Sequence, residues 1–457
     1  MPTSLIDSTY FQDMFTDAEM RQIFSDDNRL QKWLDTEVAL AEAQETVGVI
    51  QKGTAQKIRD IALIENIDEA AMKAEFDRVG FPILPFVHQL TKACDSETAR
   101  WVHYGATTQD ILDTGTVLQM REGLQWVETE LDAIIKAVSV QVKTHRETVM
   151  AGRTFQQLAA PITFGYKAAI WLDELLRHKE RLQEIKQRVL VGQCSGAVGT
   201  FATLGDRGLE VQEKMFEILK LDMPDVSWHV ARDRWSELVQ YFALLSATFA
   251  KIANEVAILM RSEIGELSEP FEQGRGASTT LPQKRNPITC EPIIAVAYKL
   301  RELASSQLSA MIQEHERGAL GQMHLEWMVI PEAFAMISGS LKNSRFILEN
   351  LVVAEQQMKD NIMLGGGLIM SEAVMMGMAP KIGKKKAHDI VYKAAGRAWD
   401  ERISLKEALM QCEDVTTLLS ESEIDALLDP LNYVGIAPQM VDRVLAKAKH
   451  KMEWRSN

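Results

Sequence analysis

The stretch LVQYFALLSATFAKIANEVAIL, residues 238–259, decides the expected fold. Large apolar residues recur along it at spacings of 4, 3, 4, 3, 4 and 3, at Leu238, Phe242, Leu245, Phe249, Ile252, Val256 and Leu259. This periodicity predicts one apolar stripe along a single helix, on the order of 30 Å long at about 1.5 Å per residue. A second stripe of the same kind runs through Phe164, Ala168, Trp171, Leu175, Leu182, Ile185 and Val189.

Long amphipathic helices of this kind suit antiparallel bundle packing, and such bundles often bury further stripes between subunits. No comparable series of alternating strands bounded by turns is present, so an all-α fold is expected. The triple glycine at residues 365–367 predicts a hinge. We expect three helical domains: an N-terminal domain over residues 1–110, a central long-helix bundle over 111–365, and a C-terminal domain over 366–457.

The charge balance excludes several classes of partner. The chain has 50 basic and 64 acidic residues, a net charge of −14. Nucleic-acid binding and docking on anionic membranes both need a basic surface, so neither is expected. The four cysteines form no C-x-x-C pair, and the start of the chain has no secretory signal pattern. These features predict a soluble cytoplasmic protein with reduced thiols.

Residues 274–287, GRGASTTLPQKRNP, form a loop that combines flexibility with chemistry. Glycine frees the backbone, the hydroxyl groups can accept a proton, and Lys284 and Asn286 bring a positive charge and a directed amide. Such donors can gather around a carboxylate and stabilise charge that develops on it. On composition alone, a basic surface loop between two helices explains the stretch equally well.

The same loop resembles the signature loop of the fumarase/aspartase superfamily, whose pattern is roughly G-S-S-x-M-P-x-K-x-N. Ser278 stands at the first serine of that pattern, Thr279 replaces the second, and Leu281 replaces the methionine. The proline, Lys284 and Asn286 match. The resemblance implies that Ser278 is the general base. It also implies that Thr279, Lys284 and Asn286 bind the substrate, with the last two stabilising an enolate-like intermediate.

Two earlier segments resemble the other active-site segments of this superfamily, in the same order. Residues 102–110, VHYGATTQD, resemble the first, and residues 152–161, GRTFQQLAAP, resemble the second. Either segment alone is also explained as a helix cap or a turn. The resemblance makes these residues candidates for contact with the substrate: Thr107, Thr108, Gln109, Asp110, Arg153 and Gln157. It further implies a homotetramer with a roughly 20-helix core, in which each active site draws its three segments from three subunits.

Two phenylalanines depart from the pattern. Adenylosuccinate lyases and fumarases have a histidine where this chain has Phe155, and adenylosuccinate lyases have another where it has Phe81. Neither side chain can donate a proton. Hydroxide needs a general acid because it is a poor leaving group, whereas a carboxylate, with a pKa of about 4, needs none. The two phenylalanines therefore favour a leaving group that is stable without protonation.

Several segments are similar to the 3-carboxy-cis,cis-muconate cycloisomerases. They are VHYGATTQD, SWHVARDRW at residues 227–235, and HERGALGQMHLEW at residues 315–327. This similarity adds His103, His229, Arg317 and His324 to the candidates, although each histidine is also explained as a hydrogen-bonded residue in helix packing. One departure is Leu158, where that family often has histidine.

The other histidines indicate no metal site, because none of the nine lies in an H-x-x-x-H or H-E-x-x-H arrangement. No cofactor is expected. Four of them stand among charged neighbours and are expected to lie on solvated helix faces: His145, His178, His388 and His450.

These observations predict an enzyme acting on a small di- or tricarboxylate. Ser278 removes the proton beside a carboxylate, the loop donors and Lys284 hold the aci-carboxylate, and a β leaving group departs, as in the cycloisomerases. One alternative is a C–N lyase that releases fumarate from an N-substituted aspartate. Another is a non-catalytic structural protein, like the lens crystallins derived from this superfamily.

Overall fold

The computed structural model describes residues 4–318 and 320–453 of the 457-residue chain. It is mostly helical, as predicted, and it also contains two small antiparallel sheets of two strands each. The strands are β1 (Val149–Thr154) with β2 (Gln157–Thr163), and β3 (Leu267–Ser268) with β4 (Val352–Val353). The all-α prediction is therefore right for the bulk of the chain and wrong for these segments.

The chain divides into two compact units, each built from three separate stretches. Unit 1 comprises the chain up to Glu130, Lys179–Phe249 and Pro292–Lys342. Unit 2 comprises Leu131–His178, Ala250–Glu291 and the chain from Asn343 onward. The three-domain division, with boundaries near residues 110 and 365, stays a prediction.

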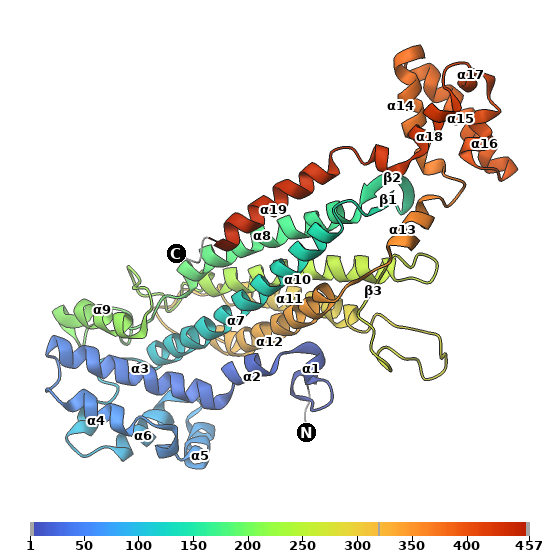
Figure 1. The fold of residues 1–457 in the computed structure, drawn as a ribbon. Coiled ribbons are helices and arrows are strands. Elements are labelled where there is room, and N and C mark those ends of the chain that lie inside the picture. Colours follow the sequence, from blue (N-terminus) through green and yellow to red (C-terminus); the bar gives the residue numbers. More distant parts are fainter. Residues whose placement is uncertain (1–3, 319, 454–457) are drawn as a thin grey trace. The chain divides into compact units, whose positions relative to one another are not determined.

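Five long helices have residues in both units: α7 (Thr108–Thr144), α8 (Phe164–Val189), α10 (Asp233–Leu259), α11 (Cys290–Ser309) and α12 (Gln322–Glu349) (Figure 1). The two predicted apolar stripes lie on α10 and α8, and every residue of both is buried. Within unit 1, the Gln240 amide of α10 donates to the Ala304 carbonyl of α11 at 2.7 Å. Within unit 2, Lys167 of α8 pairs with Glu255 of α10 at 2.5 Å.

The helix α10 is long and apolar enough to cross a membrane by length and composition alone. Half of its most apolar window is already buried inside the protein, and the core helix of a soluble protein passes the same test. The burial of its whole stripe is what a core helix requires.

The remaining helices of unit 1 are α1 (Gln12–Phe15), α2 (Ala18–Ile23), α3 (Asp26–Val47), α4 (Thr54–Ile61), α5 (Glu69–Val79), α6 (Ile83–Ala93) and α9 (Gly208–Leu219). Ser25 begins α3 because its side chain accepts from the Asn28 N–H, and Gly48 ends it in the left-handed conformation. A core cluster that includes Trp33, Leu34 and Phe86 joins α3, α4 and α6 to the start of α7.

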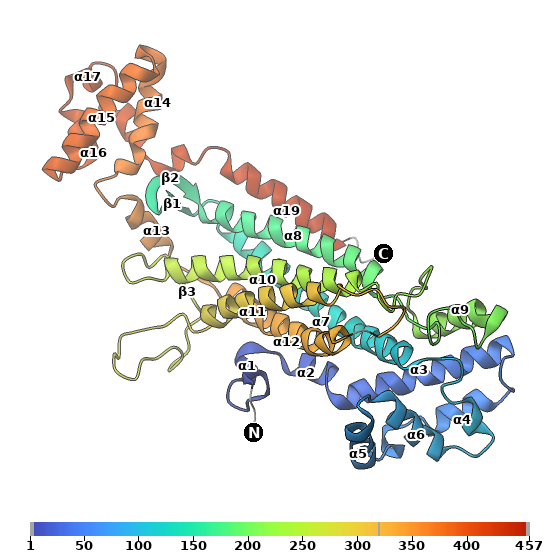
Figure 2. The same cartoon turned by 180° about the vertical axis from the view of Figure 1, so that it is seen from behind.

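Unit 2 contains α13 (Glu355–Ile362), α14 (Ser371–Ile382), α15 (Lys384–Glu401), α16 (Leu405–Met410), α17 (Glu413–Thr416), α18 (Glu421–Leu428) and α19 (Ala437–Glu453). Figure 2 shows α14, α15, α16 and α17 gathered in one cluster. A second core cluster, which includes Val374, Ile390 and Leu409, fills the space among them.

The triple glycine before α14 forms a tight turn. All three residues have positive φ, at 70°, 72° and 79°. This conformation is accessible to glycine at little steric cost. A Cβ at Gly366 would lie 2.9 Å from the Ile403 carbonyl oxygen, and the Gly366 carbonyl accepts from the Leu405 N–H at 2.8 Å. The segment predicted as a hinge is thus packed against the start of α16.

Two of the four histidines expected on solvated faces are buried. His145 is 8% exposed, its Nδ1 lies 3.1 Å from the Thr148 hydroxyl, and its ring packs edge-on against Phe164. His178 is 1% exposed. The prediction of a solvated face is wrong for both, because charged neighbours in sequence do not fix which helix face is covered.

Candidate active site

The first predicted segment is held by Asp110 at the start of α7. The carboxylate of Asp110 accepts from the N–H groups of Thr107, Ser195 and Gly196 at 3.0–3.1 Å. It also lies 2.8 Å from Nε2 of His229. Part of this arrangement is helix capping, since an acidic residue in the first turn reaches back to the residue before the helix. Asp110 has no exposed surface and fixes the segment in place, and its assignment to substrate contact stays a prediction.

His229 and Gln109 belong to the same buried network. The second ring nitrogen of His229 lies 3.0 Å from the Ser227 hydroxyl, and the His229 side chain is fully buried. The Gln109 amide donates to the His229 carbonyl at 2.8 Å and to Asp113 at 3.1 Å. The structure thus brings Gln109, Asp110 and His229 together in one buried network. The adjacent Thr107 is 8% exposed, and Thr108 is half-buried.

His103 forms a close pair with Glu37, a residue that the sequence analysis missed. The Nδ1 atom of His103 lies 2.6 Å from one carboxylate oxygen of Glu37, and the His103 N–H donates to the other at 3.1 Å. Burial by itself lowers the pKa of His103, but the charges of Glu37 and Asp110 outweigh it and raise the pKa above its ordinary value. The backbone φ of His103 is 59°, a left-handed conformation uncommon outside glycine. His103 is therefore a protonatable group held in place by Glu37, four residues before Thr107 in the sequence.

A sequence signal for Glu37 exists. Glu37 follows Trp33 and Leu34 on α3 at spacings of four and three and precedes Ala41 by four, so it falls on the apolar face of its helix. A carboxylate on such a face must be paired to offset the cost of burial.

A second buried ion network lies next to this segment. The Arg232 guanidinium pairs with Asp113 at 2.7 Å and with Glu326 at 2.8 Å, and all three side chains are almost fully buried. The Arg232 group also lies 4.0 Å from the ring centre of Trp235. Burial lowers the pKa of Arg232, but the two carboxylates reverse that effect and raise it. This network ties α7 and α12 to the residue just before α10 within unit 1.

Arg317 and His324 also lie in unit 1. The Arg317 side chain donates to the Ala197 carbonyl at 2.9 Å, next to the glycine that Asp110 holds. The exposed ring of His324 lies 5.7 Å from that of Phe81 and 4.8 Å from that of Trp327. Phe81 stands where adenylosuccinate lyases have a histidine. In this chain its ring packs against that of His324.

The second predicted segment forms the β1–β2 hairpin of unit 2. Arg153 makes a two-pronged ion pair with Glu266, at 2.9 and 2.6 Å, and the amide of Asn361 also donates to Glu266. The charge of Arg153 is thereby neutralised inside the protein, and its assignment to substrate binding stays a prediction. Gln157, the first residue of β2, is exposed. Phe155, at the tip, is completely exposed.

The signature loop is closed at its neck by backbone pairing. The N–H and side-chain amide of Asn286 both donate to the Gly276 carbonyl at 3.1 Å, and Ala277 pairs with Arg285 as an antiparallel bridge. A Cβ at Gly276 would lie 2.8 Å from the Asn286 carbonyl oxygen, so the close approach requires glycine. The side chain of Asn286 thus also serves the loop's own structure.

Ser278 and Lys284 lie within this closed loop. The Ser278 hydroxyl oxygen accepts from the N–H groups of Thr280 at 3.2 Å and Leu281 at 3.0 Å. Thr279 and Lys284 are exposed, and Lys284 forms no ion pair with any residue that the structure describes. Backbone donors favour the charged form of a hydroxyl group, and an unpaired lysine is available to an anion.

The predicted residues thus fall in both units, with the first segment, Arg317 and His324 in unit 1 and the hairpin and signature loop in unit 2. The composition of each active site from three subunits stays a prediction. In the described ranges 4–318 and 320–453, no group of three or more histidine, cysteine, aspartate or glutamate side chains is placed to hold a metal ion.

Comparison with known families identifies the class of protein. Residues 14–301 match the family model described as "Lyase", and residues 367–444 match "Adenylosuccinate lyase C-terminus". The chain belongs to the fumarate lyase superfamily, the fumarase/aspartase superfamily of the sequence analysis. A solved structure, the fumarate lyase from Mesorhizobium sp. BNC1, is 43% identical, with a TM-score of 0.89 over 94% of this chain and 98% of that one.

Relatives with different named activities are about equally similar to this chain. The N-acetyl-S-(2-succino)cysteine lyase of Dickeya dadantii is 39% identical over 98% of both chains. The 3-carboxy-cis,cis-muconate cycloisomerase of Acinetobacter baylyi is 38% identical over 97% of this chain and 99% of its own. Trans-aconitate decarboxylase 1 of Mycosarcoma maydis is 38% identical over 95% of this chain and 88% of its own. The chain is a lyase or cycloisomerase of this superfamily, and identity alone does not select among the substrates.

Proposed function

We propose that this enzyme removes the proton from the carbon beside a substrate carboxylate and then expels a substituent from the β carbon. The geometry of Ser278 carries the proposal, because its hydroxyl oxygen accepts from two backbone N–H groups. Those donors stabilise the alkoxide that would take the proton. The electron pair of the broken C–H bond passes into the carboxylate, giving an aci-carboxylate that the unpaired Lys284 stabilises. That pair then forms the C=C bond as the leaving group departs with the electrons of its own bond.

His103 has a supporting role in this scheme. Its pKa is raised because Glu37 and Asp110 outweigh the effect of burial. In the homotetramer that we propose, a protonated His103 from a different subunit than Ser278 would attract a second carboxylate of a di- or tricarboxylate substrate. Because Glu37 engages Nδ1, the nitrogen left for the substrate is Nε2.

The leaving group is proposed to be a carboxylate, as in a 3-carboxy-cis,cis-muconate cycloisomerase. Phe155 and Phe81 replace the histidines of the water- and purine-releasing branches and cannot donate a proton. A carboxylate, with a pKa of about 4, departs without one. In the opposite direction the same steps add a carboxylate to a C=C bond and close a lactone.

Sulfur is a second candidate leaving group. A relative that is 39% identical bears the name N-acetyl-S-(2-succino)cysteine lyase. A thiolate, with a pKa of about 8.5, also departs far more easily than hydroxide. A C–N lyase is the third candidate, with an amine that leaves from its ammonium form.

A substrate panel tests the proposal. It contains a carboxymuconate and its lactone, an S-(2-succino)cysteine derivative, argininosuccinate, adenylosuccinate and malate, followed by the absorbance of the muconate and fumarate chromophores. The expected result is turnover of the first pair, with malate and adenylosuccinate inert. Robust turnover of either of these two would overturn the argument from the phenylalanines. We further propose that the enzyme works in the cytoplasm as a homotetramer.

A further inference from the structure

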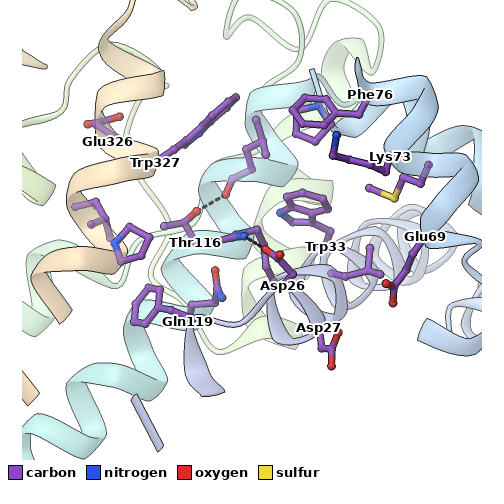
Figure 3. A pocket seen from close by; sticks show the side chains of 18 of the residues that line it. Asp26, Asp27, Trp33, Glu69, Lys73, Phe76, Thr116, Gln119, Glu326 and Trp327 are labelled. Carbon is purple, nitrogen blue, oxygen red and sulfur yellow. Dashed lines mark hydrogen bonds and ion pairs between the residues drawn. The ribbon is translucent and has the colours of Figure 1, made fainter. Parts of the chain in front are cut away.

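Unit 1 contains a cavity of about 550 Å³ that the proposed reaction does not use. It lies among α3, α5, α7, α10 and α12, and none of the predicted site residues lines it. Figure 3 shows Trp33, Phe76 and Trp327 turned toward its interior from three different helices. Cavities of roughly 300–1,000 Å³ hold drug-sized ligands in proteins, so this one is large enough for a small organic molecule.

The wall of the cavity is aromatic. Three indole rings and two phenyl rings line it, from Trp33, Trp235, Trp327, Phe24 and Phe76. Four aliphatic side chains and two prolines add further apolar surface, and the remaining lining residues are charged or polar. Aromatic rings present a negative face to a ligand, which attracts an organic cation placed over it. If the ligand also has an apolar body, that body covers the aromatic surface and removes it from water.

The side chains that line the cavity include more carboxylates than cations. The two lining cations are already paired, Arg29 with Asp26 and Lys73 with Asp77. The carboxylates of Asp27 and Glu69, both exposed, form no ion pair with any residue in the described ranges. Figure 3 shows Asp27 and Glu69 on neighbouring helices at one side of the cavity.

Helix stabilisation explains part of this acidity. Asp27 and Glu69 each lie in the first turn of a helix, α3 and α5, where a carboxylate interacts favourably with the helix dipole. The dipole is equivalent to only about half a positive charge at each N-terminus, so a net negative charge remains. That charge complements a cation and opposes an anion of the same size.

The helix α5 can also give way to a ligand. None of its residues is buried, and Met72 and Phe76, which face the cavity, are only half-buried. An element with so few buried apolar contacts opens at low free-energy cost. It therefore supplies an entry route without disturbing the buried network around Arg232.

We propose that this cavity is a binding site for an organic cation with an aromatic body, of the arylalkylammonium class. The aromatic body lies among the indole and phenyl rings, and the ammonium group faces Asp27 and Glu69. The cavity is separate from the residues of the proposed reaction. A failed test of cation binding would therefore leave the proposed lyase activity standing, and the reverse also holds.

Binding is measured by calorimetry and by tryptophan fluorescence on the full-length protein. The probe is 2-phenylethylammonium, and 3-phenylpropionate is the anionic match of similar size. The cation is expected to bind at least about tenfold more tightly than the anion, with affinity that falls as salt is added. Equal affinity for the two, or no binding of the cation, would overturn the proposal.

Three variants locate the site. Neutralising the acids with Asp27→Asn and Glu69→Gln together should weaken binding of the cation about three- to tenfold. Glu65→Gln with Asp60→Asn makes the same charge change elsewhere in unit 1 and should leave it unchanged. Met72→Trp fills the cavity from the loosely packed helix and should abolish binding while lyase turnover persists. If the cation binds the filled variant as before, it binds elsewhere.

Discussion

Ser278 is the residue on which the proposed reaction most directly depends. Its hydroxyl oxygen already accepts two backbone hydrogen bonds, the arrangement that a developing alkoxide needs. Lys284 follows in the same loop. It is exposed and forms no ion pair with any residue that the structure describes. A base and an anion-stabilising cation are thus carried by one loop, whose neck is closed by Gly276 and Asn286.

The first prediction is that Ser278→Ala lowers kcat at least about a thousandfold, roughly 4 kcal/mol at 1.36 kcal/mol per decade. Substrate binding should largely survive, whereas Lys284→Ala should weaken both binding and rate because it removes a charge from ground state and intermediate. Thr280→Ala is the matched loop control, since it keeps the backbone N–H. Solvent-deuterium exchange at the acidic carbon is the readout. If exchange continues in Ser278→Ala while product formation stops, another residue is the base.

The second prediction concerns Glu37 and His103. Folding raises the pKa of His103 above its ordinary value of about 6.5, because the carboxylates of Glu37 and Asp110 outweigh burial. The pairing therefore stabilises the folded state fully below pH 6.5, and this contribution is lost as the pH rises through the raised folded pKa. Glu37→Gln removes the charge that sustains the shift.

The free energy of unfolding should accordingly differ most between wild type and Glu37→Gln at about pH 6, and less at about pH 9. Denaturant titrations at both values measure it. Glu42→Gln, on the same helix but in an exposed pair with Arg59, is the control and should show little pH dependence. A difference of equal size at both pH values would mean that Glu37 matters only as a hydrogen-bond acceptor.

At the scale of elements, the β1–β2 hairpin is the most informative. Its two-residue turn places Phe155 at φ 49° and Gln156 at φ 64°. Turns of this kind favour Asn-Gly or Asp-Gly, because both central residues need positive φ. A fully exposed phenylalanine in a strained turn is poor for the stability of the isolated hairpin, which indicates that position 155 serves another purpose.

The third prediction is that Phe155→Asn with Gln156→Gly stabilises the hairpin by about 1 kcal/mol or more, since it relieves two left-handed residues. Hydrogen exchange of the amides in β1 and β2 measures the effect. Thr154→Gly, a neighbouring residue outside the positive-φ pair, should lower protection instead. The same double change should reduce turnover if Phe155 shapes the active site, and Phe155→His should not speed release of a carboxylate.

At the scale of the whole molecule, several apolar side chains on the long helices are exposed to solvent in the single chain. Exposed examples within unit 1 are Leu244 on α10, Tyr298 and Leu308 on α11, and Met328 on α12. Exposed apolar residues that gather on long helices mark surfaces for association. They support the proposed homotetramer.

The fourth prediction is that light scattering at micromolar concentration gives the mass of four chains of 51.4 kDa each. Leu244→Lys should lower that mass and the activity together, because each active site is predicted to need three subunits. Leu63→Lys alters a similarly exposed leucine outside the long helices and should change neither. A monomeric wild type with full activity would contradict the shared site.

The sequence by itself determined the helical class, both buried stripes and the family. These features are local: a stripe depends on the spacing of residues within one helix, and the signature loop lies within 14 consecutive residues, 274–287. The β1–β2 hairpin was not predicted because its strands are short and its turn lacks the Asn-Gly or Asp-Gly pair that usually indicates a hairpin.

Only the tertiary structure decided which predicted polar residues are paired with groups distant in the sequence. Asp110 and His229 meet across 119 residues of sequence, and Arg153 and Glu266 across 113. Glu37 is 66 residues from His103. Burial makes such partners obligatory, since an unpaired charge in the interior is costly, but nothing in the local sequence says which distant group supplies the pairing. The half-buried Ser278 and the exposed Lys284 form no ion pair with a distant group, and their assignment to the reaction, made from the local pattern, stays a prediction.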